Sequence, residues 1–346
     1  MTGEAGIEER ELGRTGRRVS VLGFGSGAGG GLMVRADGDD RVRAVQRAIE
    51  AGITYFDTAP GYGSGRSEEN LGRALNALDA WKEVVVGTKV RLTATDYADP
   101  VVAVRRSCEA SLERLGHDRV DLLQLHNPVS LTGESTSPTG DDAPLSEVLA
   151  GVAEGMEAVQ RAGLVGDLGF TGLGDTQGLH QVARDGRFSA VQGYFNALNP
   201  SAGYRGAAGG GQDFEGLIDV CADAGVGVLA FRVLAAGALI GQPDRHPLAG
   251  TPDAPLDRGP TYEGNTERAR SLAPIVAEFE LESPLELALR FAQSKHGVSS
   301  VLIGFSDLHQ LEDAVRWSAR GSLPKEAVER VAALARRHDD QGNNKP

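Results

Sequence analysis

Asp57 and Tyr62 are the first residues along the chain whose types and spacing could support chemistry. They lie in the stretch 55–63, where a short apolar run ends on the carboxylate and then turns through Pro60 and Gly61. A carboxylate and a phenol at a strand end are groups that can take part in proton transfer. On its own, the pattern is more typical of an aspartate that caps a turn beneath a packed tyrosine.

Lys89 and His126 follow the next two apolar runs, each where a strand would end. Lys89 alone could be an ordinary strand-end lysine, and His126 alone a hydrogen-bonded histidine. Together with Asp57 and Tyr62 they would place four reactive side chains where neighbouring strands end. Lowering the pKa of a tyrosine from near 10 by about two or three units requires roughly 3 to 4 kcal/mol of preferential stabilisation of the phenolate. Lys89 could supply this, Asp57 would keep the ammonium protonated, and His126 could donate to a substrate oxygen.

The sequence contains no second nucleophile, no cluster of metal-ligating residues and no phosphate-binding GxxxxGK motif. The group that arrives at the reacting carbon must therefore come from a cofactor, because the four side chains transfer only protons. A metal-dependent barrel hydrolase, one alternative, would need His and Asp ligands clustered at the strand ends.

Strand and helix patterns alternate along the whole chain. The eight predicted strands are apolar throughout, as in parallel sheets covered on both faces, and span 21–24, 53–57, 84–88, 120–125, 165–170, 190–194, 226–231 and 300–303. Helices are predicted over 40–51, 67–78 with Ser67 as N-cap, 101–115, 144–162, 177–185, 214–224, 265–280, 284–295, 308–318 and 325–337. Eight such units predict an α/β fold, a single (β/α)8 TIM barrel over residues 10–337, with an N-terminal β-hairpin and flexible termini at 1–9 and 338–346.

Glycine-rich segments are expected at the mouth of this barrel. Three long ones follow predicted strands, and in a barrel they would meet at the C-terminal mouth and enclose a substrate: 127–143, 196–212 and 235–264. Gly25, Gly27 and Gly30 match the dinucleotide motif GxGxxG. However, no helix starts directly on these glycines and no acid ends the next strand about 20 residues later, so a Rossmann fold is not indicated.

The composition, with 40% hydrophobic and 24% charged residues, is that of an ordinary globular protein. The formal net charge of −13 argues against general affinity for nucleic acid or anionic lipid, so an anionic cofactor would need a local positive pocket. Cys108 and Cys221 have no CxxC or His partner, which favours buried thiols over a disulfide or zinc site. The sequence has no apolar stretch of about 18 residues and starts with a polar segment, so we expect a cytoplasmic protein without a membrane segment.

The four side chains and their surroundings resemble the aldo-keto reductase family. The resemblance covers roughly 12–334 and rests on four stretches of sequence: 55–63, 87–89, 111–126 and 298–304. It implies a (β/α)8 barrel that binds NADP(H) without a Rossmann domain. It also implies that Tyr62 is the general acid/base, that Lys89 and Asp57 tune its pKa, and that His126 orients the carbonyl.

The resemblance implies cofactor positions at the nicotinamide end, with departures from the family pattern. Thr171 and Gly172 stand where the family usually has Ser-Asn against the carboxamide, and Gln192 matches the family glutamine at that group. Phe231 matches the aromatic that stacks on nicotinamide. The usual Ser-Pro-Leu that follows is replaced by Arg232, Val233 and Leu234, and Arg232 would face the pyrophosphate, a substrate or a rim ion pair. Gly25, Ser26 and Asp57 complete the set expected at this end, together with Leu234.

At the adenosine end, Gly304, Ser306, Gln310 and Asp313 resemble the segment that grips the cofactor in the branch that includes potassium-channel β subunits. Many relatives place a Lys or Arg here for the 2′-phosphate, but none lies between Gly304 and Val315. We therefore expect NADP(H), with NAD(H) as the alternative.

Taken together, these residues predict an NADP(H)-dependent oxidoreductase that interconverts an aldehyde or ketone and an alcohol, with a small carbonyl or alcohol as its partner and no metal. The alternative is a cofactor-binding regulatory subunit of the same fold with little turnover. The intact set of four reactive side chains argues against that alternative.

Overall fold

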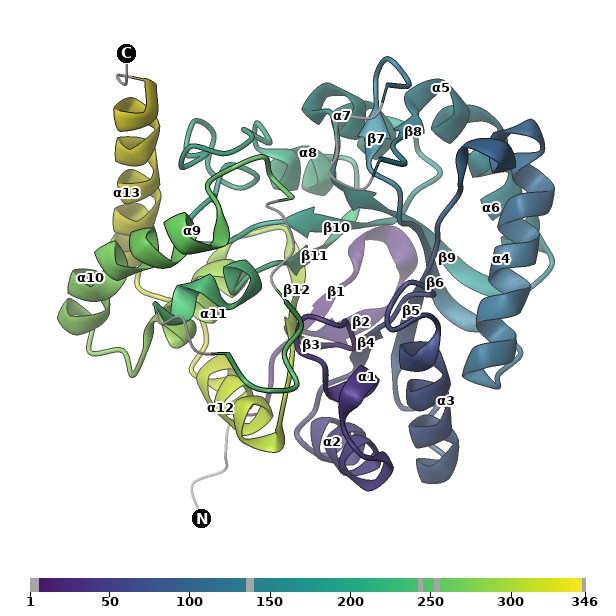
Figure 1. Ribbon diagram of the computed structural model, residues 1–346, viewed down its shortest axis with the longest axis horizontal. Coiled ribbons are helices and arrows are strands. Elements are labelled where there is room, and N and C mark those ends of the chain that lie inside the picture. Colours follow the sequence, from purple (N-terminus) through teal and green to yellow (C-terminus); the bar gives the residue numbers. More distant parts are fainter. Residues whose placement is uncertain (1–5, 135–139, 242–244, 252–255, 344–346) are drawn as a thin grey trace.

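Eight parallel strands form a closed barrel, as the sequence predicts (Figure 1). The computed structural model describes residues 6–134, 140–241, 245–251 and 256–343. In the order of their pairing the barrel strands are β3 (Leu22–Gly25), β4 (Tyr55–Asp57), β5 (Val85–Val90), β6 (Val120–Leu125), β9 (Val165–Gly172), β10 (Ala190–Tyr194), β11 (Gly227–Phe231) and β12 (Val298–Gly304). Parallel pairing brings all the carboxyl ends of these strands to one mouth.

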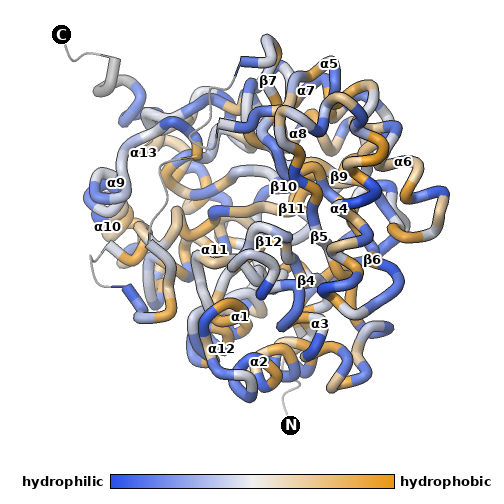
Figure 2. Tube along the Cα trace, turned by 45° about the vertical axis from the view of Figure 1, so that its right-hand side comes forward, coloured by the Kyte–Doolittle hydropathy of each residue, from blue (hydrophilic) through white to orange (hydrophobic). Residues whose placement is uncertain are grey.

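Amphipathic helices surround the barrel and bury their apolar faces against it. They are α2 (Gly38–Glu50), α3 (Arg66–Leu78), α4 (Pro100–Leu115), α6 (Ala153–Arg161), α7 (Thr176–Arg184), α8 (Leu217–Asp223), α11 (Pro284–Ser294) and α12 (Leu308–Ala319). Along the chain trace, hydrophobic residues alternate with hydrophilic ones on these helices (Figure 2). This pattern is what a helix with one buried and one solvated face requires.

The predicted N-terminal hairpin closes the floor of the barrel. Its antiparallel strands are β1 (Glu9–Glu11) and β2 (Arg18–Ser20). Gly13 in the turn has a φ of +53°, and a Cβ there would lie 2.2 Å from the backbone nitrogen of Gly227. Only glycine therefore allows the hairpin to sit this close to β11. Leu12 and Val19 then join the apolar cluster inside the barrel.

Further elements lie outside the eight strands and the eight helices around them. They include α1 (Leu32–Arg35), β7 (Val129–Ser130), β8 (Ala143–Pro144), α5 (Leu145–Glu147), a π-helical stretch at Val148–Val152, a 3-10 turn at Ala235–Ile240, α9 (Tyr262–Ala269), α10 (Ala273–Glu278) and α13 (Lys325–Asn343). Helix α13 packs beside α10 at one side of the barrel (Figure 1). The expected loops 127–143 and 235–264 are described only outside 135–139, 242–244 and 252–255.

Several predicted element ends differ from the structure. The most consequential concerns Ser67, which is inside α3 and does not cap it, because Gly65 is the N-cap residue. The Ser67 hydroxyl instead donates to the Ser26 carbonyl and bonds the Thr58 hydroxyl. Of the termini expected to be flexible, residues 1–5 and 344–346 lie outside the described residues, whereas Glu9 begins β1 and α13 continues to Asn343.

The close packing of α3 on α4 gives a stability prediction. A Cβ at Gly72 in α3 would lie 2.0 Å from the Leu115 carbonyl oxygen. We expect Gly72→Ala to lower the free energy of unfolding by about 1 to 3 kcal/mol through overpacking, despite the roughly 1 kcal/mol that alanine gains over glycine in a helix. Urea unfolding measures this. Gly38→Ala, at the open start of α2, is the control and should be neutral or stabilising, and equal behaviour of the two variants would contradict the close contact.

Candidate active site

The four predicted reactive side chains meet at the mouth of three neighbouring strands. Asp57 ends β4, Lys89 is the penultimate residue of β5, and His126 directly follows β6. Tyr62 lies in the turn between β4 and α3. Because β4, β5 and β6 pair in that order, their carboxyl ends bring the four residues together.

Lys89 is fully buried and is the centre of the group. Its Nζ donates to Asp57 Oδ2 at 2.7 Å, to the Thr58 carbonyl oxygen at 2.8 Å and to Tyr62 Oη at 3.3 Å. An ammonium has three protons, so these three acceptors satisfy it completely. The side chain also lies over the Tyr62 ring, with Nζ 4.8 Å from the ring centroid.

Burial and charge act in opposite directions on the pKa values of this group. Burial lowers the pKa of Lys89, but the charges of Asp57 and Tyr62 more than offset this, and the pKa rises above its ordinary value. For Tyr62, burial is the largest effect and raises the pKa, while Lys89 lowers it. The expectation that Lys89 brings the phenol pKa below its ordinary value is therefore wrong, although the direction of the lysine's effect agrees with it.

His126 contacts Tyr62 edge to face, with ring centroids 5.9 Å apart. Burial holds the pKa of His126 well below its ordinary value, and the charges of Lys89 and Arg91 add to this effect. The imidazole is therefore neutral at physiological pH. Its buried Nδ1 has no hydrogen-bond partner within the described part of the chain.

A cavity of about 420 Å³ runs from Asp57 and Tyr62, which line it, to α12. Lys89 and His126 are not among its lining residues. Ten of the twelve positions predicted to contact a cofactor line it: Gly25, Asp57, Gln192, Phe231, Arg232, Leu234, Gly304, Ser306, Gln310 and Asp313. Ser26 and Thr171 are buried behind the wall and are not among the lining residues. The Thr171 hydroxyl has no partner among the described residues and lies beside Gln192 in the strand register.

At the Tyr62 end of the cavity, Gln192 and Phe231 have clear structural partners. Gln192 Nε2 donates to Asp57 Oδ1, so this amide supports the ion pair between Asp57 and Lys89. The Phe231 ring packs edge to face against Tyr194, with centroids 5.8 Å apart. Arg232, directly after it, has a left-handed φ of +58°, which is strained for a residue with a side chain.

At the α12 end, Ser306 and Gln310 bind one another and the glycine segment. The Ser306 backbone nitrogen donates to Gln310 Oε1 at 2.9 Å, and its hydroxyl donates to the Gly30 carbonyl at 2.6 Å. Asp313 accepts from Arg316 at 2.5 Å. These contacts hold the loop after β12 against the loop after β3.

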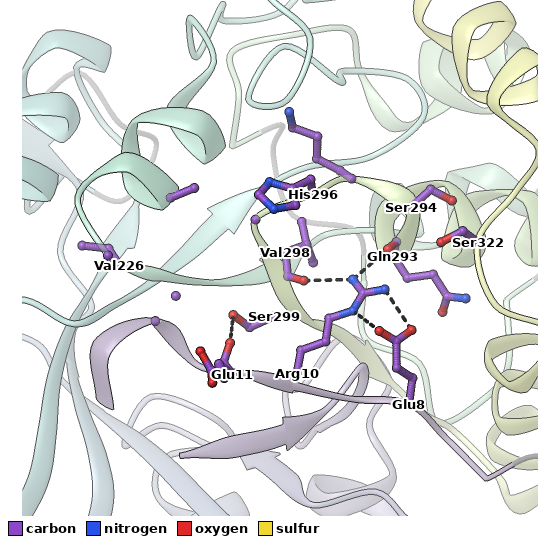
Figure 3. A pocket seen from close by; sticks show the side chains of 16 residues that line it. Glu8, Arg10, Glu11, Val226, Gln293, Ser294, His296, Val298, Ser299 and Ser322 are labelled. Carbon is purple, nitrogen blue, oxygen red and sulfur yellow. Dashed lines mark hydrogen bonds and ion pairs between the residues drawn. The ribbon is translucent and has the colours of Figure 1, made fainter. Parts of the chain in front are cut away.

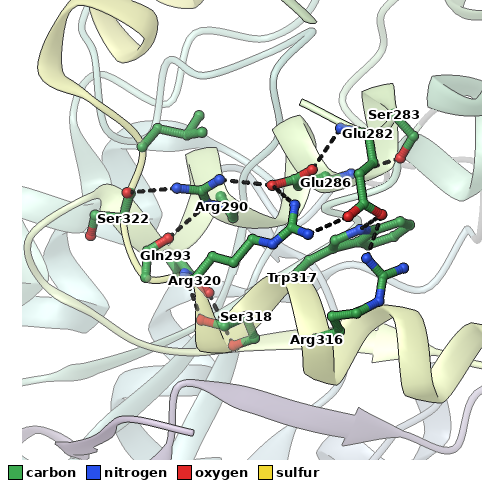
Figure 4. A network of polar contacts seen from close by, with 12 residues as sticks. Glu282, Ser283, Glu286, Arg290, Gln293, Arg316, Trp317, Ser318, Arg320 and Ser322 are labelled. Carbon is green, nitrogen blue, oxygen red and sulfur yellow. Dashed lines mark hydrogen bonds and ion pairs between the residues drawn. The ribbon is translucent and has the colours of Figure 1, made fainter. Parts of the chain in front are cut away.

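A charged network fixes this end from outside (Figure 4). Glu282 binds Arg316 and Arg320 and accepts from Trp317 Nε1 at 3.0 Å. Because Arg316 also binds Asp313, the network orients both Trp317 and Asp313 along the cavity wall.

The cavity wall also includes residues that the sequence analysis did not single out, among them Arg245, His246 and Trp317. His246 Nε2 lies 3.4 Å from Asp307 Oδ2, at the start of α12. Arg245 and His246 fall in a long loop without hydrophobic periodicity. Their only signal in the sequence is a pair of basic side chains in a segment that follows β11.

A second cavity, of about 590 Å³, lies at the opposite end of the barrel between the hairpin and the start of β12 (Figure 3). Arg10 there donates to Glu8 and to the carbonyls of Gln293 and Val298. Its charge is thus already compensated. Within the described ranges, no three His, Cys, Asp or Glu side chains gather as a metal site would require, and no helix is long and apolar enough to cross a membrane.

Comparison with known proteins gives a consistent family match. The model of the aldo/keto reductase family matches residues 21–336. The chain is 28% identical to L-galactose dehydrogenase of Arabidopsis thaliana, over 89% of this chain and 87% of that protein. It is 28% identical to D-threo-aldose 1-dehydrogenase of a Pseudomonas species (88% and 91% covered) and 26% identical to L-glyceraldehyde 3-phosphate reductase of Escherichia coli K12 (90% and 87% covered).

Among solved structures, the holo form of an aldo-keto reductase from Bacillus halodurans superposes with a TM-score of 0.71. The alignment covers 95% of this chain and 96% of that one, at 20% identity. This likeness shows the fold.

The low pKa of His126 gives a prediction for stability against pH. The native state stays unprotonated at His126 while the unfolded chain binds a proton below about pH 6.5, so acid favours unfolding. Between pH 7.5 and 5.5, the wild type should lose about 1 kcal/mol of unfolding free energy relative to His126→Gln, which has no titrating group there. Urea unfolding of both proteins at the two pH values checks this, and a constant difference would mean that the folded imidazole titrates normally.

Proposed function

Because this chain belongs to the aldo/keto reductase family, we propose that it is an NADP(H)-dependent oxidoreductase that interconverts an aldehyde or ketone and an alcohol. In this proposal Tyr62 is the general acid/base. The observation that carries it is the position of Lys89 Nζ, 2.7 Å from Asp57 Oδ2 and 3.3 Å from Tyr62 Oη, behind the two residues of the group that line the cavity, Asp57 and Tyr62.

The proposed roles follow from charge and protonation. Burial keeps the Tyr62 phenol protonated, so it can donate to a carbonyl oxygen as that oxygen gains negative charge. The Lys89 ammonium then stabilises the phenolate left behind. Asp57 keeps that ammonium in place, and neutral His126 can hold the same substrate oxygen with a ring N–H. The opposite direction, alcohol oxidation, uses the same groups in reverse.

The cavity fits a nicotinamide dinucleotide, which would supply or accept the hydride. Phe231 offers an aromatic face and Gln192 an amide at the Tyr62 end. The Thr171 hydroxyl, buried beside Gln192, has no partner among the described residues. Ser306, Gln310 and Asp313 offer polar groups at the other end. We propose NADP(H) because members of the family usually bind it. Its preference over NAD(H) should be modest, because segment 304–315 has no Lys or Arg for the 2′-phosphate.

The relatives and the site support a small carbonyl compound or alcohol as substrate. Three relatives are named for L-galactose, an aldose and L-glyceraldehyde 3-phosphate. We therefore propose a hydroxylated carbonyl compound or its alcohol. Both cysteines are free and buried, which suits a reducing compartment such as the cytoplasm.

The regulatory-subunit alternative draws on Ser306, Gln310 and Asp313. These residues suggest the branch that includes potassium-channel β subunits, and all three line the cavity. A regulatory subunit would bind the dinucleotide with little turnover. The complete ion-paired group at Lys89 favours catalysis instead, and steady turnover with a panel of carbonyl compounds distinguishes the two.

Removing only the Tyr62 hydroxyl tests the acid/base assignment. We expect Tyr62→Phe to bind NADP(H) almost unchanged but to reduce carbonyl compounds at least about a hundredfold more slowly, the low end for a positioned proton donor. Equilibrium titration and steady-state kinetics measure the two quantities.

Tyr204→Phe is the matched control, because it removes a tyrosine hydroxyl outside the cavity. It should leave both quantities unchanged. If Tyr62→Phe kept most of its activity, or lost cofactor binding as well, the assignment would be wrong.

A further inference from the structure

Two polar side chains are fully buried inside the barrel, below its mouth: Tyr55 on β4 and Gln124 on β6. Tyr55 stands two residues before Asp57, so the two side chains point to the same face of the strand. Gln124 lies directly opposite Lys89 in the pairing of β5 with β6. Neither the Tyr55 hydroxyl nor either polar atom of the Gln124 amide has a hydrogen-bond partner among the described residues.

Glycines leave room for these two side chains. A Cβ at Gly87 would lie 2.3 Å from the Tyr55 hydroxyl oxygen, and a Cβ at Gly169 would lie 2.9 Å from Gln124 Cγ. Bulky branched side chains usually fill the interior of such a barrel. Here the glycines admit polar groups instead, although a buried polar group without a hydrogen bond is unfavourable. The position of Tyr55 and Gln124 therefore calls for a group that both can bind.

Asp57 is a group that can accept from both. An ionised carboxylate offers about four lone-pair sites for hydrogen bonds. Lys89 donates to Oδ2 and Gln192 donates to Oδ1, which leaves about two of these sites open. The Tyr55 O–H group and the Gln124 N–H groups are donors of the kind that the open sites need.

The pKa values of these groups agree with this pairing. Burial raises the pKa of Asp57, whereas Lys89, Gln192 and Gln124 act to lower it. Gln124 therefore lies close enough to favour the ionised carboxylate, although its amide is not aligned for a full hydrogen bond. Burial raises the pKa of Tyr55 well above its ordinary value, and Asp57 adds to this effect. The Tyr55 hydroxyl thus stays protonated and can donate.

We propose that Tyr55 and Gln124 are positioning residues, which donate to the Asp57 carboxylate from inside the barrel. They thereby keep Asp57 ionised and hold the Lys89 ammonium against Tyr62. The terminal torsion of a glutamine is broad, so a small turn of the amide aligns it with the carboxylate. The inference rests on the proposed function, in which Lys89 stabilises the Tyr62 phenolate. Tyr55 and Gln124 are not among the residues that line the cavity.

Steady-state reduction of carbonyl compounds by the full chain tests this. The variants are Gln124→Met and Tyr55→Phe, each of which nearly keeps the shape of the side chain and removes its donor. We expect each to lower kcat about tenfold, the smaller end for a lost hydrogen bond to a charged group, and to bind NADP⁺ as the wild type does. Gln160→Met is the control and should change neither quantity, because that amide lies on α6 and donates to the Gly166 carbonyl.

Two further readouts separate this role from a merely structural one. In the Lys89→Met background, Gln124→Met and Tyr55→Phe should change kcat little, because the ammonium that Asp57 holds is gone. In urea unfolding, both variants should have a lower midpoint than the wild type, since a buried carboxylate loses a donor. Removal of a polar group that has no partner would instead leave the midpoint unchanged or raise it.

The outcomes distinguish this inference from the proposed function. Wild-type kcat in Gln124→Met or in Tyr55→Phe would overturn the role of that residue. An equal loss in the wild-type and Lys89→Met backgrounds, or an unchanged or higher urea midpoint, would do the same. Failure of the wild type to reduce any carbonyl compound would overturn the proposed function, and the urea midpoints would then still decide whether the two donors hold Asp57.

Discussion

The buried ion pair between Asp57 and Lys89 is the interaction on which the rest of the site depends. Removing two charges from water costs several kcal/mol per ion, so such a pair persists only when its other donors and acceptors are satisfied. Here the ammonium also binds the Thr58 carbonyl and Tyr62, and Asp57 also accepts from Gln192. These groups come from β4, β5 and β10, so the pair is complete only when the barrel has closed.

The interior of the barrel is built to receive this pair. Tyr55 lies two residues before Asp57 on β4, and its hydroxyl occupies the space that a side chain at position 87 would need: a Cβ on Gly87 would lie 2.3 Å from it. Beneath, Leu12 and Val19 from the hairpin join Leu122 and Leu229 in an apolar floor. Because this floor is apolar, the described residues leave Tyr62 open on the side of the cavity, and a substrate and a cofactor would have to meet there.

Much of the fold could be predicted because its signals are local. Each barrel strand is a short apolar run, and Asp57, Lys89 and His126 stand where such runs end, so eight units in series imply one mouth and its residues. Arg245 and Trp317 could not be found this way, since their place in the cavity depends on how a long loop and α12 fold back. The same holds for Ser67, whose hydroxyl prefers Ser26 and Thr58 to the helix end, and for Gln192, whose amide binds Asp57.

The central claim is that Lys89 acts on the reaction through Tyr62, and a double-mutant cycle on carbonyl reduction tests it most directly. Turnover would be measured for the wild type, Lys89→Met, Tyr62→Phe and the double variant, with thermal unfolding to confirm that each is folded. If Lys89 works by stabilising the Tyr62 phenolate, Lys89→Met should lower turnover by about a hundredfold when Tyr62 is present. The same change should alter turnover little in the Tyr62→Phe background. An equal loss in both backgrounds would contradict the account, because it would show that the two residues act independently.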